Sequence, residues 1–377
     1  MRELAARLER ELPDMLALTE RIAAIDTPSD APAIATVADA IAAVLADAGL
    51  VVERGPAPLQ VALVRRFGPG PRALVLGHTD TVWPDGTAAG WPVTRDGDLL
   101  RGPGVGDMKA NIVMAAFAIR ALVAAGAHGL GELRFLLVPD EELGSPNGRP
   151  WIEAAARESD ACLGLEPARP GGGIVTQRGA VGALVVRATG RSAHTTEPDP
   201  RSAVSVLAPL VAELEALGDR AAGSAATVGI FRGGDARQVI PDHAELHLDL
   251  RAPDAAAADA LLRAVHATID AARTRTPCPI ATDGGWRRPP YTAGAGTRAL
   301  YEVARAAGAE VGLATFEVHE RGGSDVSFAG ALGLPCLDGL GPITHDSCSR
   351  EERVEIASIP RRAYVLARLL AAIGHGA

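Results

Sequence analysis

The sequence has little lysine, few aromatic residues and no long hydrophobic run. Lys109 is the single lysine, so arginine supplies the other 36 of the 37 basic residues, and aromatic side chains make up only 3% of the chain. No stretch reaches the roughly 18 uninterrupted apolar residues that a membrane-spanning helix requires. The basic residues form no stripe, and the net charge is −9. We therefore expect neither nucleic acid nor a membrane as a partner.

Cysteine is also scarce, with four residues that are widely scattered and form no C-x-x-C pair. A disulfide framework is not expected in a chain of this size without an export signal. Residues 1–11 are charged throughout and lack the apolar core of a secretory signal. These observations predict a cytoplasmic protein.

What the sequence does contain is enough apolar material for more than one core. Hydrophobic residues make up 47% of 377 residues, and single cores usually stop growing below this length. Between about 51 and 166, short β-rich runs alternate with alanine-rich helical runs. This alternation predicts an α/β domain with a mixed, mostly parallel sheet and helices on both faces.

The pattern changes in the middle of the chain. There the order strand, helix, strand, strand, helix predicts an inserted α+β (ferredoxin-like) domain, and the strand over 244–251 alternates cleanly, with Leu246, Leu248 and Leu250 on one face. The stretch 284–290, Gly-Gly-Trp-Arg-Arg-Pro-Pro, is interpreted as a linker. We expect one discontinuous domain, 1–177 and 289–377, interrupted by an insert over 178–288.

Histidines and acidic residues follow several of the apolar runs. In open α/β sheets, ligands bind beyond the carboxyl ends of the strands. Histidine and carboxylate are ligands of zinc and related metals. The residues in question are His78 and Asp80 after 72–77, Asp107, Glu141 and Glu142 after 133–138, Glu166 after 161–165, and His345. Together they predict a two-metal site.

Each of these residues taken alone has a plain structural alternative. His78 could be a satisfied histidine near a turn, and Asp107 could be a helix N-cap, a role compatible with bridging two cations. Glu141 and Glu142 could form a solvated turn. Because adjacent side chains diverge, however, one of the two could bind a metal while the other acts as general base.

Several motifs in order resemble the co-catalytic zinc metallopeptidases of the M20 class, most closely the glutamate carboxypeptidase (carboxypeptidase G) branch. They cover nearly the whole chain. The motifs are Gly77-His-Thr-Asp80, Arg101-Gly-Pro-Gly-Val-Gly-Asp-Met-Lys-Ala110, Asp140-Glu-Glu-Leu-Gly144, Glu166, Gly322-Gly-Ser-Asp325 and His345. The resemblance implies an α/β catalytic domain with an inserted lid domain that dimerises.

The resemblance also implies roles for the metal-site residues. Asp107 would bridge two zinc ions, for which cobalt or manganese could substitute. His78 and Glu166 would complete one site, and Glu142 and His345 the other. Asp80 would orient His78, and Glu141 would be the general base. The peptide bond Asp107–Met108 is expected to be cis.

Residues of the insert are implied as well. His194 would stabilise the oxyanion in the partner subunit's site, and Arg251 would bind the substrate carboxylate. Arg287 or Arg288 could share that work, and Gly323 could offer a backbone N–H. Two departures bear on the site: Gln238 stands where asparagine is expected, and the segment 346–352 after His345 is long enough to bring in Cys348 as an adventitious ligand.

Three hypotheses follow for the function. The first is a carboxypeptidase that releases C-terminal glutamate or a similar amino acid from a small peptide. The second is an N-acyl amino acid deacylase or amidohydrolase of the same family, of the acetylornithine deacetylase or aminoacylase type. The third is a dimeric scaffold that has lost catalysis, which predicts decay of the ligand set.

Overall fold

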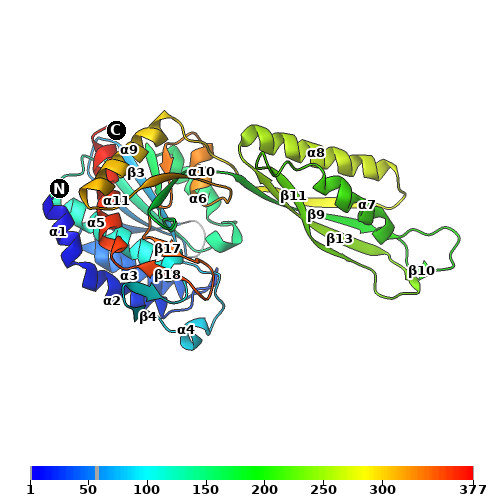
Figure 1. The fold of residues 1–377 in the computed structure, drawn as a ribbon, viewed down its shortest axis with the longest axis horizontal. Helices are drawn as coiled ribbons and strands as arrows, with labels where there is room; N and C mark the ends of the chain where they lie inside the picture. The colour runs from blue at the N-terminus through cyan, green and yellow to red at the C-terminus, as the bar shows by residue number, and fades with distance from the viewer. Residues whose placement is uncertain (1, 56–58, 377) are drawn as a thin grey trace. The chain divides into compact units, whose positions relative to one another are not determined.

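The computed structural model describes residues 2–55 and 59–376. They form two compact units (Figure 1). Unit 1 comprises Met1–Gln177, Thr292–His319 and Ser324–Ala377, and unit 2 comprises Arg178–Tyr291 and Glu320–Gly323.

Unit 1 is built on a six-stranded sheet. Its strands run in the order β1 (Val51–Arg54), β2 (Val61–Arg66), β6 (Glu132–Val138), β3 (Arg72–His78), β7 (Ala161–Gly164) and β16 (Cys336–Leu337). β6, β3, β7 and β16 are mutually parallel, whereas β2 is antiparallel to both of its neighbours. The predicted mixed, mostly parallel sheet is confirmed.

Helices cover both faces of this sheet. On one face, Leu63, Val75 and Leu163 join a single core with one large helix layer. That layer consists of α1 (Arg2–Arg10), α2 (Leu12–Ala23), α3 (Ile34–Ala46), α5 (Ala110–Ala125), α9 (Ala295–Glu310) and α11 (Ser358–Gly374). On the other face, Gly164 lies against Val326 of α10 (Val326–Ala331), which packs on α6 (Arg149–Arg157).

α5 is the central helix of this core. With the preceding segment it forms Val105–Ala125, the one helix among residues 2–55 and 59–376 that is long and apolar enough to cross a membrane. Its most apolar window is 78% buried inside the protein. The apolar composition of α5 is therefore that of a core helix.

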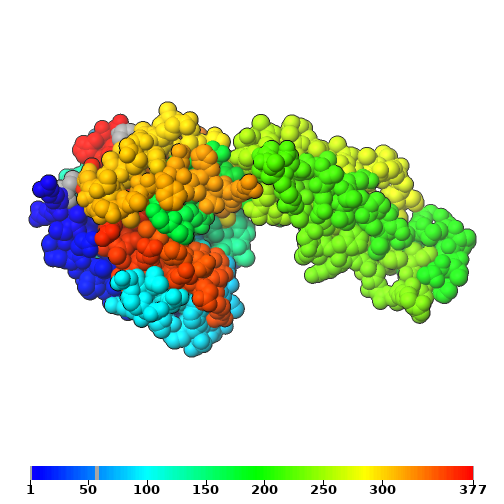
Figure 2. All heavy atoms as spheres, viewed as in Figure 1, coloured from blue at the N-terminus to red at the C-terminus, as the bar shows by residue number. Residues whose placement is uncertain are grey.

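A smaller antiparallel sheet brings the C-terminal segment beside the segment that follows β3. Its order is β17 (Thr344–His345), β18 (Arg353–Glu355), β5 (Leu99–Arg101) and β4 (Thr94–Asp96). The orange-red surface around β18 adjoins the cyan surface around β4 and β5 (Figure 2). Segments some 250 positions apart in the sequence thus become neighbours. Elsewhere, β8 (Gly173–Arg178) pairs with β15 (Phe316–Glu320).

Unit 2 is a four-stranded antiparallel sheet with two helices on one face (Figure 1). The strand order is β11 (Ala225–Gly233), β13 (His243–Ala252), β9 (Ala180–Thr189) and β14 (Ile280–Arg288). The helices are α7 (Ala203–Glu215) and α8 (Ala255–Thr274), capped by the side chains of Ser202 and Asp254. Leu246, Leu248 and Leu250 face these helices, as the alternation in β13 predicts.

The interpretation of 284–290 as a linker is wrong. Most of this stretch belongs to β14, whose pairing with β9 is irregular between Trp286 and Arg288. Gly284 and Gly285 adopt φ of 115° and 148°, which most residues avoid, so the glycines permit a kinked edge strand. Sequence patterns that weigh glycine as a breaker miss such a strand.

The second crossing between the units lies beyond residue 288. The backbones of Arg178 and Tyr291 exchange two hydrogen bonds, of 3.1 and 3.0 Å, which keep Tyr291 with unit 2. Gly179 N–H donates to Glu320 O at 2.8 Å, which adds residues 320–323 to the same unit.

Candidate active site

The site residues of unit 1 lie where its parallel strands end. His78 is the last residue of β3, Glu141 and Glu142 form the turn after β6, and Glu166 follows β7. Asp107 precedes α5 in the segment η1 (Val105–Lys109), where its own backbone is not helical, with φ of −127° and ψ of 87°. The carboxyl ends of neighbouring parallel strands meet at one edge of the sheet, so the topology gathers these side chains.

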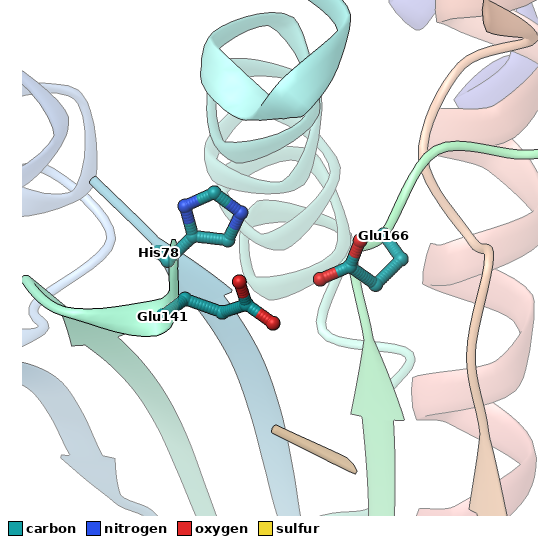
Figure 3. A group of neighbouring side chains, drawn as sticks. All are labelled: His78, Glu141 and Glu166. Atoms are coloured by element: carbon teal, nitrogen blue, oxygen red, sulfur yellow. The ribbon is translucent and has the colours of Figure 1, made fainter. Parts of the chain in front are cut away.

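Two groups of potential metal ligands share His78. In one, ligand atoms of His78, Asp107 and Glu142 all lie within 4.8 Å of one another, and in the other the same holds for His78, Glu141 and Glu166. Nε2 of His78 is 3.1 Å from Oδ1 of Asp107. Figure 3 shows the carboxylates of Glu141 and Glu166 turned toward each other beside the His78 ring.

Asp80 is fully buried and contacts His78, Glu141 and Glu142. Its Oδ1 lies 3.2 Å from Nδ1 of His78, which leaves Nε2 facing Asp107. The same carboxylate accepts the backbone N–H groups of Glu141 and Glu142 at 3.2 and 3.1 Å. Ser29 Oγ also donates to it, at 2.6 Å. The backbone oxygen of Asp80 also lies 3.0 Å from Nδ1 of His78. Asp80 thus contacts both the histidine and the backbones of the two glutamates.

The electrostatics reflect several carboxyl groups crowded into a buried space. Burial and the nearby Asp107 raise the pKa of Glu142 to about 8 and hold the pKa of Glu166 well above its usual range. Burial is the largest influence on Asp107 and opposes its ionisation, but the hydrogen bond with His78, the charge of His78 and the Cys348 thiol together outweigh it and lower the pKa of Asp107. The hydrogen bonds with Asp107 and Asp80 likewise overcome burial and raise the pKa of His78.

The segment around Asp107 needs glycine for close packing. A Cβ on Gly106 would lie 2.2 Å from Cγ2 of Thr344 in β17. Gly104 has φ of 65°, and a Cβ there would lie 2.5 Å from Cγ2 of Thr81. The Asp107–Met108 peptide bond is cis, which confirms that prediction.

His345 joins neither ligand group. Its Nε2 instead lies 2.8 Å from Oε1 of Glu355, across the β17–β18 pair. Cys348, which is exposed, reaches the site: its Sγ donates to Oδ2 of Asp107 at 3.3 Å. The long segment after His345 therefore does contact the predicted bridging carboxylate.

Sequence patterns missed two buried carboxylates that support the site. Asp338 accepts the N–H of Glu166 at 3.3 Å and the hydroxyl of Ser324 at 2.6 Å. Glu352 accepts the N–H groups of Gly106 and Asp107. Asp338 directly follows the strand-like run 334–337, a signal that could have found it, whereas Glu352 sits in a polar segment with no such signal.

The predicted residues of unit 2 form two sets. His194 in β10 (Ala193–His194) pairs in register with Val239 of β12 (Val239–Ile240), so the exposed Gln238 lies nearby and its carbonyl accepts the Thr195 N–H. Nδ1 of His194 lies 2.9 Å from the Thr196 hydroxyl oxygen.

The second set consists of arginines on the open face of the unit 2 sheet. Arg251 and Arg288 flank Val181 in register, on β13 and β14. A Cβ on Gly323 would lie 2.8 Å from the Arg288 side chain, so Gly323 and Arg288 are in contact. Arg287 lies at the irregularity of β14 and is exposed. Arg251 makes a bidentate pair with Asp249, at 2.9 and 3.0 Å.

Comparison with known proteins decides the family. A family model described as peptidase family M20/M25/M40 matches residues 74–372. The chain belongs to this family. The resemblance seen in the sequence is thereby confirmed, and the protein is a hydrolase of a metallopeptidase family.

Relatives and solved structures agree with the M20 assignment. The chain is 29% identical to carboxypeptidase G2 of Pseudomonas sp. (strain RS-16), over 97% of this chain and 91% of the relative. It is 31% identical to a succinyl-diaminopimelate desuccinylase of Leptothrix cholodnii, over 69% and 74%. An M20 metallo-carboxypeptidase from Sulfolobus solfataricus shares the fold, with a TM-score of 0.78 at 15% identity and coverage of 96% and 99%.

The residues of unit 1 fit the metal dependence of M20 enzymes. Oε1 of Glu142 is buried and has no hydrogen-bond partner among residues 2–55 and 59–376. Buried charges in proteins are paired or coordinate metals. Asp107, Glu141, Glu142 and Glu166 converge around a single histidine, a donor set suited to divalent cations.

Proposed function

We propose that this protein is a di-zinc hydrolase that cleaves an amide bond next to a free carboxylate and releases C-terminal glutamate or a similar amino acid from a small peptide. The observation that carries the proposal is the pair of ligand groups around His78. The similarity to carboxypeptidase G2 over 97% of the chain supports the substrate class.

The proposed ligands keep the roles that the resemblance implies. Asp107 would bridge the two ions, His78 and Glu166 would complete one site, and Glu142 and His345 the other. Zinc bound there would supply Lewis acidity for the attack of water on an amide carbonyl. His345 would have to leave Glu355, a partly exposed pair, to take this role.

Glu141 is the proposed general base. It is nearly buried, and its backbone is fixed by Asp80. Its carboxylate would accept a proton from the attacking water and deliver it to the leaving amine nitrogen. His194 would stabilise the developing oxyanion from a partner subunit.

The roles of Glu141 and of the metal can be tested separately. Protein freed of metal by a chelator should lose peptidase activity and regain it with zinc or cobalt. The Glu141→Gln variant should bind metal as the wild-type protein does and yet lose turnover by at least about 100-fold. Full activity in chelator, or full turnover in Glu141→Gln, would refute the respective role.

Arg251 is the proposed anchor for the substrate carboxylate. Its guanidinium now holds Asp249 in bidentate geometry, the geometry that a substrate carboxylate would require. Arg251→Lys should therefore raise KM for carboxyl-terminal substrates with little change in kcat. Asp249→Asn, which weakens the internal competitor, should lower KM. Unchanged KM in both variants would move this role to Arg288 or Arg287.

A second candidate is an N-acyl amino acid deacylase with the same metal site. The 31% identity to a protein named succinyl-diaminopimelate desuccinylase favours it. A panel of dipeptides, N-acyl glutamates and N-succinyl amino acids would separate the two. The substrate class with the highest kcat/KM identifies the activity.

We also propose that the protein is a cytoplasmic homodimer through unit 2. β11 is an edge strand of its sheet and exposes Ile230 and Phe231, each to 38%. An unpaired edge with apolar side chains favours pairing with a second chain. Light scattering should give twice the 38.8 kDa chain mass, and a charged Ile230→Lys variant should be monomeric.

A further inference from the structure

Glu352 is a buried carboxylate in the segment 346–352, which follows His345. Its exposed fraction is 1%. Oε1 accepts the N–H of Gly106 at 2.7 Å and the N–H of Asp107 at 3.1 Å. The backbone N–H of Cys348 also donates to this carboxylate. One side chain thus gathers backbone donors from two segments that are far apart in the sequence.

The two segments meet at Asp107. Oδ1 of Asp107 faces His78, and Oδ2 accepts from the thiol of Cys348 at 3.3 Å. Glu352 therefore binds the backbone of Asp107 directly. It also binds the backbone of Cys348, whose thiol contacts Oδ2 of the Asp107 carboxylate.

The segment 346–352 is itself anchored on its outer side. The guanidinium of Arg350 lies 5.1 Å from the ring centres of both Trp83 and Trp91, two of the four tryptophans in the chain. Stacking of arginine on aromatic rings stabilises such a placement. The contacts of Arg350 thus favour the placement of the segment that carries Glu352.

We propose that Glu352 is a positioning residue of the metal centre, which sets the place of the Asp107 carboxylate by binding the backbone at Gly106 and Asp107. The inference rests on the proposed function, in which Asp107 bridges two ions. Groups that orient metal ligands typically affect metal affinity about 10–100-fold. Glu352 touches no reacting atom in this scheme.

The test measures metal binding in the full chain. Metal-free protein is titrated with Co²⁺ by calorimetry, and the absorption of bound cobalt is recorded. The variants are Glu352→Ala, which removes the acceptor, and Glu352→Gln, which keeps an amide oxygen for the two N–H groups. Glu351→Gln is the control, because it makes the same charge change on the neighbouring side chain, which is 76% exposed.

We expect Glu352→Ala to weaken Co²⁺ binding about 10–100-fold and to alter the cobalt spectrum. Glu352→Gln should restore part of the affinity, with a loss of roughly fivefold, because a neutral acceptor binds N–H groups less strongly than a carboxylate. Glu351→Gln should match the wild-type protein.

A role limited to holding the fold predicts a different result. Both Glu352 variants would then melt at a lower temperature when metal-free, yet bind Co²⁺ with wild-type affinity and spectrum once folded, and this result overturns the inference. If Glu352→Ala does not fold, equal affinity of Glu352→Gln and Glu351→Gln overturns it. A wild-type protein that binds no Co²⁺ would instead refute the proposed function.

Discussion

Gly106 offers a sharp test of how tightly the metal-site segment is packed. A Cβ at this position would lie 2.2 Å from Cγ2 and 2.8 Å from Oγ1 of Thr344. Ordinary contact begins near 3.4 Å, so the two segments must separate by about 1.2 Å (3.4 minus 2.2). Since φ of Gly106 is not positive, the obstacle to alanine is space alone.

Gly106→Ala should therefore destabilise the protein by the cost of overpacking, about 1–3 kcal/mol. Chemical unfolding of the metal-free protein, followed by circular dichroism, measures this directly. Gly90→Ala is the matched control, because a Cβ there meets nothing within 4 Å. The control should change the free energy of unfolding by less than about 0.5 kcal/mol.

Removing the obstructing side chain should rescue the variant. Thr344→Ala alone loses the hydrogen bond to Pro342 O and should cost about 1 kcal/mol. In the double variant the Cγ2 and Oγ1 clashes are gone, so its destabilisation should fall below the sum of the two single effects by at least about 1 kcal/mol. Additive effects would refute the steric explanation.

Three further outcomes are expected. A thiol reagent should modify all four cysteines in denaturant but at most Cys348 in the native chain, because Cys162, Cys278 and Cys336 are buried. Cys348 should react slowly, because burial and the nearby Asp107 raise the pKa of its thiol; modification of more than one cysteine in the native chain would contradict these burials. Arg362→Met should raise the free energy of unfolding by about 1–3 kcal/mol. Arg362 is fully buried, its guanidinium has no hydrogen-bond partner among the described residues, and burial lowers its pKa to about 10. A lower free energy of unfolding in a denaturant titration would contradict the absence of a partner for this guanidinium. Glu355→Gln should tighten Zn²⁺ binding roughly two- to fivefold, because it releases His345 from a partly exposed ion pair. A competition assay measures the affinity, and weaker binding would show that Glu355 helps His345 to bind the metal.

The ends of the strands could be predicted from the sequence, because at each of them an apolar run stops and a histidine or acidic residue follows. Each of His78, Glu141 and Glu166 follows an apolar run, and such runs became β3, β6 and β7. The topology rule then predicted one shared edge. The roles of these residues stay proposals, but their proximity needed no information beyond the local patterns.

Other parts of the site depend on contacts between distant segments, which no local pattern encodes. Glu352 lies next to Glu351 in a polar stretch, yet one is buried against Gly106 and the other is exposed. The approach of Thr344 to Gly106 arises only when β17 and β18 join β5. β14 was missed for a different reason, because Gly284 and Gly285 resemble a turn until the strand is seen at a sheet edge.

The reciprocal hydrogen bonds between Arg178 and Tyr291 bring the entrance and exit of the central segment together. Paired residues in such a bridge have their Cα atoms about 5.5 Å apart. A turn of a few residues can span that distance, so residues 179–290 could be excised with little displacement of the flanking chain. Any hydrolysis by the truncated protein would measure what unit 1 achieves alone, and any change in substrate preference would measure the contribution of the insert.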